Sequence, residues 1–232
     1  MIERRAFADL GGADHGWLKA KHHFSFAGYY DPGRMGWGDL RVWNDDEIAA
    51  QTGFPPHPHA DMEIITYVRD GAITHKDSMG NTGRTEAGDV QVMSAGSGIR
   101  HSEYNLEDKP TRIFQIWIVP TAHGGKPAWG TKPFPKSDRS GRFIALASGF
   151  ANDNEALPIR ANARVLGATV KAGERITLDL DPHRHAYLVP ATGAVEVGGV
   201  RINARDGAAI TDVATVEIVG LEDAEVVLVD AA

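Results

Sequence analysis

The most informative segment of this chain is Gly53-Phe54-Pro55-Pro56-His57-Pro58-His59-Ala60-Asp61-Met62-Glu63-Ile64-Ile65-Thr66-Tyr67-Val68. A Gly-Phe-Pro-Pro turn opens it, and its end has the β-branched and aromatic composition of a strand. His57 and His59 lie between the two. Side chains two apart on an extended segment point to the same face, so both imidazoles are presented in one direction.

A second segment carries a matching pattern after a glycine-rich turn. It reads Gly96-Ser97-Gly98-Ile99-Arg100-His101-Ser102-Glu103-Tyr104-Asn105. His101 and Glu103 are again two residues apart, so if the two segments lie side by side, three imidazoles and one carboxylate converge. Such a donor set suits a first-row divalent cation and leaves room for an exogenous ligand. The glycines are interpreted as the turn that delivers His101 and not as a phosphate cradle, because no Lys-Ser/Thr follows them.

Short apolar runs separated by Gly, Pro and Asp turns recur along the whole chain. Arg69-Asp70-Gly71 is a hairpin signal between two of them. Strands at spacings of roughly 8–12 residues are typical of sandwiches and barrels, so we predict an all-β fold. Helices are expected to be few and short, with one over Asn44–Ala50 behind a capping residue. The predicted strands are Leu40–Trp43, Ile64–Val68, Ala72–His75, Val90–Met93, Arg112–Val119, Arg142–Ala147, Ala163–Val170, Arg175–Leu180, Tyr187–Val189, Val195–Val200, Ala208–Ile210, Val216–Val219 and Val226–Val229.

The two halves of the chain resemble degenerate repeats. In both, a strand leads into a tight turn: Glu63 precedes Gly71, and His185 precedes Gly193, by the same interval. Aligning the glycines puts the second histidine pair, His183 and His185, out of register with the first, and no His-x-Glu follows it. We therefore expect a second metal site to be absent and interpret this pair as surface or partly buried. The predicted organisation is an N-terminal β-barrel domain with the site over residues 1–125, a linker over 126–140, and a C-terminal domain over 141–232.

Composition limits the function. The chain has 232 residues, a net charge of −7 and no cysteine. Disulfides, zinc ribbons, iron–sulfur clusters and thiol nucleophiles are thereby excluded. The acidic balance argues against nucleic acid and anionic membranes as partners, because both need a basic face. We expect no signal peptide and no membrane span, since no apolar run approaches ~20 residues, and predict a cytoplasmic monomer.

In the two histidine patterns and in several further segments, the chain resembles the pirin family of the cupin superfamily, in its bacterial branch. The resemblance covers essentially the whole length. The resemblance implies a bicupin fold, with one divalent metal in the N-terminal cupin and a more divergent second half. His57, His59, His101 and Glu103 occupy the family's ligand positions; Glu63 matches a glutamate that is a ligand in many other cupins. The matching segments include His15-Gly16-Trp17-Leu18, Phe24-Ser25-Phe26-Ala27, Tyr29-Tyr30-Asp31-Pro32, Asp77-Ser78-Met79-Gly80-Asn81 and Met93–Glu103.

Members of the bacterial branch are quercetin 2,3-dioxygenases, so the resemblance also implies a reaction. The substrates would be O2 and a flavonol-like aromatic, with opening of the heterocyclic ring and release of CO. The donor set is compatible with Fe(II), Mn, Ni, Cu, Co or Zn, and we favour Fe(II). We assign Glu103 two roles as a hypothesis: metal ligand, and general base that takes the proton of the flavonol 3-hydroxyl.

Two further groups of residues are predicted around the metal. Ligating histidines normally donate their second ring N–H to a neighbour, which makes nearby polar residues candidates for that support. Aromatic side chains on strands are usually core, but some of them could line a substrate pocket. The predicted pocket residues are Phe24, Phe26, Phe54, Met93 and Trp117, and the predicted supporting residues are His22, Asp61, Glu63 and Gln115.

Two other functions stay open on the sequence alone. One is a non-enzymatic, iron-dependent redox sensor that binds a protein partner, since pirin itself is described as a nuclear transcriptional coregulator. The other is a promiscuous metallo-cupin, or metallo-isomerase, acting on another enolic substrate. The complete ligand set favours catalysis, because the fold by itself hosts many chemistries.

Overall fold

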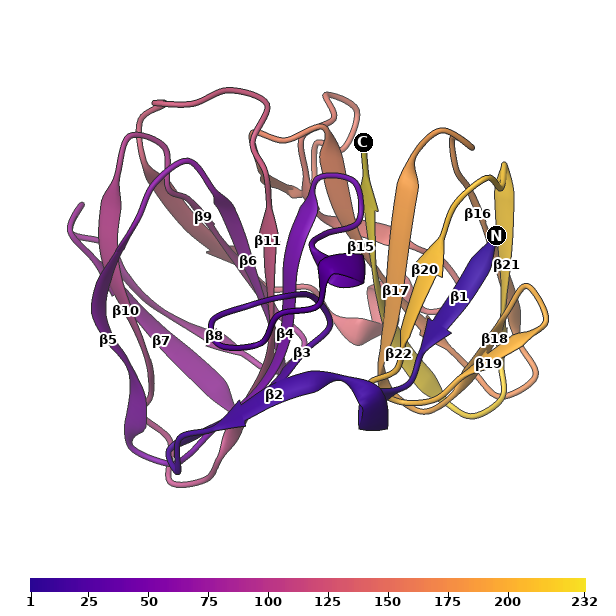
Figure 1. Cartoon of the computed structure of the whole chain (residues 1–232), viewed down its shortest axis with the longest axis horizontal. Helices are drawn as coiled ribbons and strands as arrows, with labels where there is room; N and C mark the ends of the chain where they lie inside the picture. Colours follow the sequence, from indigo (N-terminus) through magenta and orange to yellow (C-terminus); the bar gives the residue numbers. More distant parts are fainter.

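The computed structural model describes residues 1–232 as two β-barrels that lie side by side (Figure 1). It contains twenty-two β-strands, and its only helices are three short 3-10 turns: η1 (Phe7–Asp9), η2 (Pro32–Arg34) and η3 (Lys136–Arg139). The predicted all-β class is confirmed. None of these helices has the length or apolar character to cross a membrane.

The N-terminal barrel is built from a seven-stranded and a four-stranded sheet that face each other. The larger sheet has the order β12-β9-β6-β11-β4-β3-β2, and the smaller one β5-β10-β7-β8. The strands are β2 (Gly11–Asp14), β3 (Leu18–His22), β4 (Leu40–Ile48), β5 (Thr52–His59), β6 (Glu63–Asp70), β7 (Ala72–Asp77), β8 (Thr82–Glu86), β9 (Val90–Ser94), β10 (Ile99–Asn105), β11 (Thr111–Ile118) and β12 (Ala128–Lys132).

The C-terminal barrel repeats this plan. Its sheets have the orders β1-β20-β17-β22-β15-β13-β14 and β16-β21-β18-β19, in which β13 and β15–β22 take the places of β3 and β4–β11. The larger sheet differs at its two ends, where β1 from the chain's N-terminus takes the place of β12 and β14 pairs parallel with β13. The strands are β1 (Ile2–Arg5), β13 (Ile144–Ser148), β14 (Leu157–Pro158), β15 (Ala163–Val170), β16 (Arg175–Asp179), β17 (His185–Thr192), β18 (Val195–Val197), β19 (Val200–Ile202), β20 (Gly207–Ile210), β21 (Thr215–Gly220) and β22 (Ala224–Ala231).

The repeat predicted from the glycine spacing has a structural basis. Gly71 lies in the turn between β6 and β7, and Gly193 lies in the equivalent turn between β17 and β18. The backbone φ is 76° at Gly71 and 68° at Gly193. A left-handed backbone of this kind favours glycine. Because β5 and β10 correspond to β16 and β21 in this plan, the strands that carry the first histidine pattern have counterparts without histidine.

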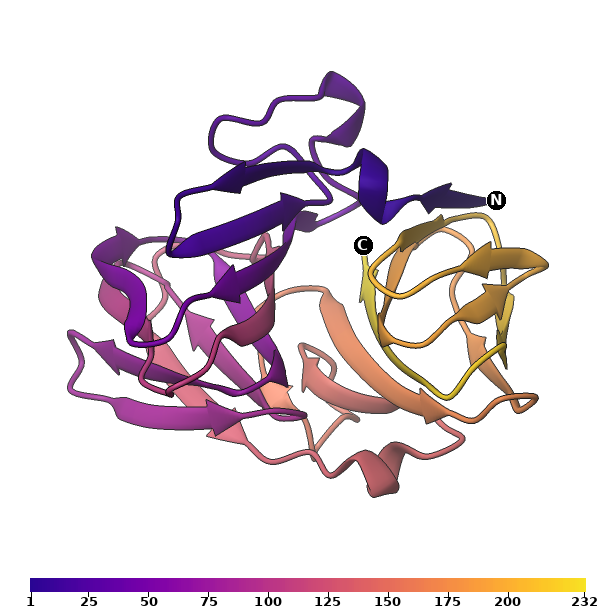
Figure 2. The ribbon, with the colours of Figure 1, turned by 90° about the horizontal axis from the view of Figure 1, so that it is seen from below.

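Strands at both ends of the N-terminal half take part in the sheets of the two barrels. The N-terminal strand β1 pairs with β20, so it is an edge strand of the C-terminal barrel (Figure 2). β12 lies inside the predicted linker 126–140, yet it pairs with β9 and forms the edge strand of the larger N-terminal sheet. The linker range therefore contains a strand and η3, and the domain boundaries stay a prediction.

The helix expected over Asn44–Ala50 does not form. Residues up to Ile48 belong to β4, which pairs with β3 on one side and β11 on the other. Hydrogen bonds to two neighbouring strands outweigh the local capping preference of Asn44, which in isolation would favour a helix start. The Asn44 side chain bonds His22 across the sheet instead of a helix N-terminus.

Apolar side chains fill the two barrels differently. The largest cluster lies between the barrels and includes Trp43, Phe114 and Tyr187. The C-terminal barrel has one continuous apolar interior. The interior of the N-terminal barrel is divided into a cluster around Ile48 and a separate one around Met93. A polar layer separates these two clusters, and the histidine patterns lie beside it.

Candidate metal centre

Strands β5 and β10 bring the two histidine patterns together. They pair antiparallel, with His101 opposite His57 and Ile99 opposite His59. Three prolines are tolerated in β5 because it is the edge strand of its sheet, where missing N–H donors leave no neighbour unpaired. A register shift between His101 and Glu103 brings Glu103 opposite Phe54. The neighbouring placement predicted for the two segments is therefore confirmed.

The turn before β10 depends on glycine and on Asp61. Gly96 has a φ of 50°, and a Cβ there would lie 2.0 Å from the carbonyl oxygen of Gly125. The backbone N–H of Asp61 donates to the Gly96 carbonyl at 2.8 Å, and the Asp61 carboxylate accepts from the N–H of Gly124 at 2.7 Å. These contacts hold the turn that leads into His101.

Three imidazoles converge at this pairing. One ring nitrogen from each of His57, His59 and His101 lies within 4.8 Å of the others. The Nε2 atoms of His57 and His101 are 3.1 Å apart. His101 is buried and the other two are half-buried, so the cluster has one side open to the exterior.

Hydrogen bonds on the far side of two rings assign their tautomers. His57 donates from Nδ1 to the carbonyl of Pro55 at 2.7 Å, which leaves a lone pair on Nε2. The carboxylate of Asp77 accepts from Nε2 of His75 at 2.9 Å, and the tautomer with its proton on Nε2 offers Nδ1 as an acceptor. His101 donates from Nδ1 to that atom at 3.4 Å, and its Nε2 also keeps a lone pair.

The donor set fits a divalent cation. Two nitrogen lone pairs that face each other at 3.1 Å repel unless a cation lies between them. Adjacent nitrogens bound at about 2.1 Å to one ion lie about 3 Å from each other, which agrees with this separation. Burial, and then neighbouring histidines, lower the pKa of His101 to about 2; burial and His57 lower that of His59 to about 4. Both rings are therefore neutral at physiological pH, as metal ligation requires.

Glu103 lies beside the three histidines and is held by a set of donors. Its carboxylate accepts hydrogen bonds from Gln91 at 2.6 Å, Gln115 at 2.7 Å and Thr66 at 3.1 Å. Burial raises its pKa, against the lowering effect of His75 and these hydrogen bonds. Its oxygens are not part of the group within 4.8 Å, so its role as a fourth ligand stays a prediction.

The donors to Glu103 belong to one polar row across five strands. Register pairs link His22 on β3 to Asn44 on β4, Asn44 to Gln115 on β11, Gln115 to Thr66 on β6, and Thr66 to Gln91 on β9. This polar row is the layer that divides the barrel's apolar interior. Because a buried carboxylate without partners would be costly, the row explains how Glu103 can remain inside the barrel.

A pocket opens in front of the histidines. It has a volume of about 260 Å³, and Glu103 is the one carboxylate in its wall. The Trp117 ring stands edge-on to His59, with ring centroids 5.0 Å apart, and Phe26 stands edge-on to Trp117 at 5.4 Å. Such a wall suits a flat aromatic guest. The lining residues are Phe26, Phe54, Pro55, His57, His59, Glu103, Gln115 and Trp117.

Comparison with known proteins places the chain in a family. Residues 3–118 match the family model described as Pirin, and residues 145–231 match the model of the quercetinase C-terminal cupin domain. The chain belongs to the pirin family. It is 73% identical to the pirin-like protein of Caulobacter vibrioides over the full length of both chains. The predicted family and its two-cupin fold are confirmed.

Two further relatives bear on the chemistry of this pirin. The quercetin 2,3-dioxygenase of Escherichia coli K12 is 40% identical, over 99% of this chain and 98% of that protein. The crystal structure of the bacterial pirin YhhW from Escherichia coli in complex with nickel(II) superposes with a TM-score of 0.93. It is 39% identical and covers 100% of this chain and 99% of that one.

The predicted pocket residues divide into two groups. Phe26, Phe54 and Trp117 line the pocket. Phe24 lies outside its wall: it is buried between the barrels, with its ring centroid 5.0 Å from that of Tyr187. Met93 also lies outside, because its side chain fills the apolar cluster with Ile64 and Ile99.

The predicted supporting residues lie near the site, but none is hydrogen-bonded to the three histidines. Gln115 supports Glu103, and its amide is oriented by Trp117, whose Nε1 donates to Gln115 Oε1 at 3.3 Å. His22 bonds Asn44 at 2.8 Å. Glu63 accepts from Ser94 at 2.6 Å, and burial raises its pKa.

His75 and Asp77 were not predicted as site residues, although His75 contacts His101 and Asp77 contacts His75. The His75 ring is buried, and it stacks on Trp129 with ring centroids 4.7 Å apart and planes 9° apart. Burial would raise the pKa of Asp77, but hydrogen bonds from His75 and Asn81 outweigh it and lower this pKa. His75-Lys76-Asp77 has the same spacing as His101-Ser102-Glu103, which was the available signal.

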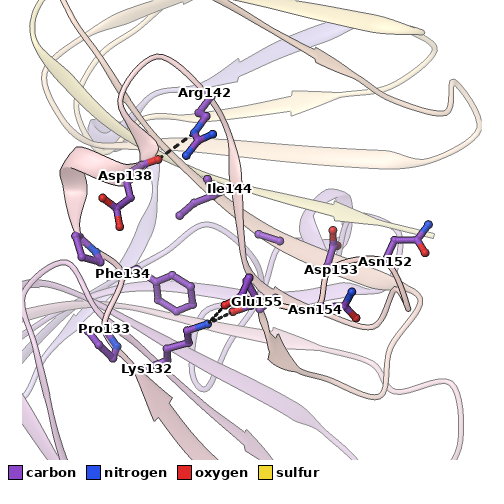
Figure 3. Close-up of a pocket in the computed structure, with 13 residues that line it drawn as sticks. Lys132, Pro133, Phe134, Asp138, Arg142, Ile144, Asn152, Asp153, Asn154 and Glu155 are labelled. Carbon is purple, nitrogen blue, oxygen red and sulfur yellow. Dashed lines mark hydrogen bonds and ion pairs between the residues drawn. The ribbon is translucent and has the colours of Figure 1, made fainter.

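Other cavities and histidines lie apart from this centre. A cavity of about 640 Å³ is lined by residues 132–135, 138, 142, 144, 145 and 152–156, with a Lys132–Glu155 ion pair at 3.0 Å in its wall (Figure 3). It contains no histidine. His183 is exposed, and His185 is half-buried with its ring 5.5 Å from that of Trp37.

Proposed function

We propose that this pirin is a metal-dependent dioxygenase that opens the heterocyclic ring of a flavonol such as quercetin. Both atoms of O2 enter the product, the C2–C3 and C3–C4 bonds break, and C3 leaves as CO. The observation that carries the proposal is the pocket: His57, His59 and Glu103 line an aromatic-walled space of about 260 Å³, and His101 converges with the two histidines beside it. The quercetin 2,3-dioxygenase names of relatives at 67%, 56% and 40% identity support the same chemistry.

The residues of the chain divide the work of binding and proton transfer. Phe26, Phe54 and Trp117 hold the planar substrate and exclude water. His57, His59 and His101 hold the metal, and Glu103 is the fourth ligand. A bound divalent metal supplies Lewis acidity toward the 3-hydroxyl and a path for electrons to O2.

Glu103 also removes the proton of the flavonol 3-hydroxyl. It is the one carboxylate of the pocket wall, and burial already favours its protonated form. Glu103 can hold this proton because its hydrogen-bond partners Gln91 and Gln115 are amides, which do not compete for it. Glu103→Gln removes the base while preserving the shape, so we expect turnover to fall about 10²-fold or more with the substrate still bound.

The remaining parts of the proposal concern the metal and the setting. We propose Fe(II) as the physiological ion, and a monomer in the cytoplasm that binds neither nucleic acid nor membrane. The nickel complex of the solved relative shows a different ion in that protein. The donors here are nitrogen and oxygen, which bind the whole first-row series, so availability decides between the ions.

The experiment follows oxygen uptake, loss of quercetin absorbance and CO release by protein loaded with Fe(II), Mn(II), Ni(II), Co(II), Cu(II) or Zn(II). We expect at least one metal form to produce CO in equal amount to the quercetin consumed. The variant with His57→Ala and His59→Ala is the matched control and should be inactive. Absence of CO with every metal would reject the proposal and favour a binding role for the metal site.

A further inference from the structure

A second, smaller cavity lies behind the pocket. It has a volume of about 70 Å³ and shares Phe26, Phe54 and Gln115 with the pocket as common wall. We call it the inner chamber. Its polar wall consists of the exposed His15 and of the buried His22, Asn44, Asp46 and Gln115, and the buried ones lie on the interior face of the large sheet. The chamber therefore continues the pocket away from the three histidines and toward the polar row.

Asp46 is the unusual member of this wall. Its side chain is 2% exposed, and its Oδ1 atom has no hydrogen-bond partner. A buried carboxyl oxygen without a partner loses the hydrogen bonds that water would give it, so its presence calls for an explanation. Its neighbour Asp45 differs, because Asp45 points to the other face of β4 and pairs with Arg69 and Arg205.

The chemistry of the chamber selects a neutral hydroxyl. Burial first, and then Asp45 and Glu103, raise the pKa of Asp46 well above its ordinary value, which favours the protonated carboxyl. That form offers one donor and one acceptor, the same pair that a hydroxyl offers in return. His22 donates from Nδ1 to Asn44, and burial lowers its pKa. No lysine or arginine lines the chamber to attract an anion. The volume admits a hydroxyl and its ring edge but not a whole ring.

We propose that the inner chamber is a subsite for a ring hydroxyl of a polyhydroxylated aromatic substrate, and that Asp46 is the residue that recognises it. This inference rests on the proposed function in one respect: that function identifies the aromatic ring system of the substrate that lies in the pocket. Phe26, Phe54 and Gln115 form the wall that the pocket and the chamber share, and the Gln115 amide donates to Glu103. In the proposed complex the ring edge passes between Phe26 and Phe54. Asp46 thus contributes to specificity and not to bond breaking.

The test compares two ligands with one core: quercetin, and 3-hydroxyflavone, which lacks every ring hydroxyl except the 3-hydroxyl. Dissociation constants are measured on metal-loaded protein without O2, by quenching of tryptophan fluorescence. We expect the wild type to bind quercetin roughly tenfold more tightly or better. Asp46→Ala should bring the two constants to within about threefold, with 3-hydroxyflavone binding unchanged, and Asp46→Asn should restore part of the preference.

Matched controls keep the outcome interpretable. Glu47→Gln changes an acidic residue on the opposite face of the same strand and should leave the preference intact. Removing an unpartnered buried carboxyl should not lower the melting temperature, which separates the effect from misfolding. A preference that persists in Asp46→Ala, or a wild type without preference, overturns the inference. Binding preference without CO production would instead count against the dioxygenase function alone.

Discussion

The Nδ1 atoms of His75 and His101 lie 3.4 Å apart, on the neighbouring strands β7 and β10. This contact links a candidate metal ligand to the carboxylate of Asp77, which is 2.9 Å from the other nitrogen of His75. The Asp77 side chain is fully buried and also accepts from the backbone N–H groups of Met79 and Asn81. The proton positions along this chain of contacts decide which nitrogen of His101 carries a lone pair.

We expect Asp77→Asn to weaken metal binding about 10- to 100-fold, the usual range for outer partners of ligating histidines. The amide preserves the Oδ1 contacts, but it donates to His75 and so reverses the tautomers of His75 and His101. Calorimetric titration with Ni(II) measures the loss, and ¹⁵N NMR of the histidine rings reports the tautomers without metal. Lys76→Gln, an exposed change on the same strand, is the control. Unchanged affinity and tautomers would contradict the assignment.

Removal of a donor to Glu103 should destabilise the metal-free protein. Gln91 donates to Glu103 at 2.6 Å inside the barrel, and Gln91→Leu leaves the carboxylate with fewer partners. We expect the free energy of unfolding to fall by about 1–3 kcal/mol in urea titrations. In a Glu103→Leu background the same change should cost much less. Equal losses in both backgrounds would show that Gln91 acts independently of Glu103.

The stability of the protein should fall in mild acid because of His23. This ring is fully buried, 2.9 Å from the Tyr187 hydroxyl, and burial and then Arg5 lower its pKa to about 3 from 6.5. The unfolded chain binds a proton near pH 6.5, whereas the folded chain does so only near pH 3. The stabilisation is therefore complete above pH 6.5 and declines below it, by about 2 kcal/mol at pH 5.

His23→Gln isolates this contribution. Urea unfolding of metal-free protein at pH 8 and pH 5 should show a smaller loss in the variant than in the wild type, by about the same 2 kcal/mol. Identical losses would mean that His23 is not responsible for the acid sensitivity.

The apolar cluster between the barrels should make them unfold together. Trp43 is fully buried, with its ring centroid 5.4 Å from that of Phe114 and 5.7 Å from that of Tyr187 in the other barrel. Trp43→Ala should cost about 3–5 kcal/mol and lower the melting temperature of a single transition. Calorimetry distinguishes this from two separate transitions, which would show that the barrels are independent.

Local pattern was sufficient for most of the strands and for the histidine cluster. Period-two spacing placed His57 with His59 and His101 with Glu103. From the sequence, the approach of the two segments was only a condition, and the pairing of β5 with β10 meets it. The same reasoning failed at Asn44–Ala50, because strand pairing on both sides of β4 is a tertiary effect that a capping residue does not reveal.

Residues whose surroundings depend on strand register and strand pairing were harder to predict from the sequence. Met93 and Phe24 have the right chemistry for a pocket, but the face each one takes follows from the register of its strand. His75 approaches His101 only after β7 pairs with β10, and Asp46 becomes notable only once its missing partner is known. These properties depend on contacts between distant segments.

The most direct test is an anomalous difference map from crystals of the protein loaded with Fe(II) in the absence of O2. We expect one iron peak per chain, about 2.1 Å from Nε2 of His57, Nε2 of His101 and one ring nitrogen of His59, with a Glu103 oxygen as the fourth protein ligand. A peak bound through other residues, or no peak between these three rings, would contradict the metal centre on which the proposed function depends.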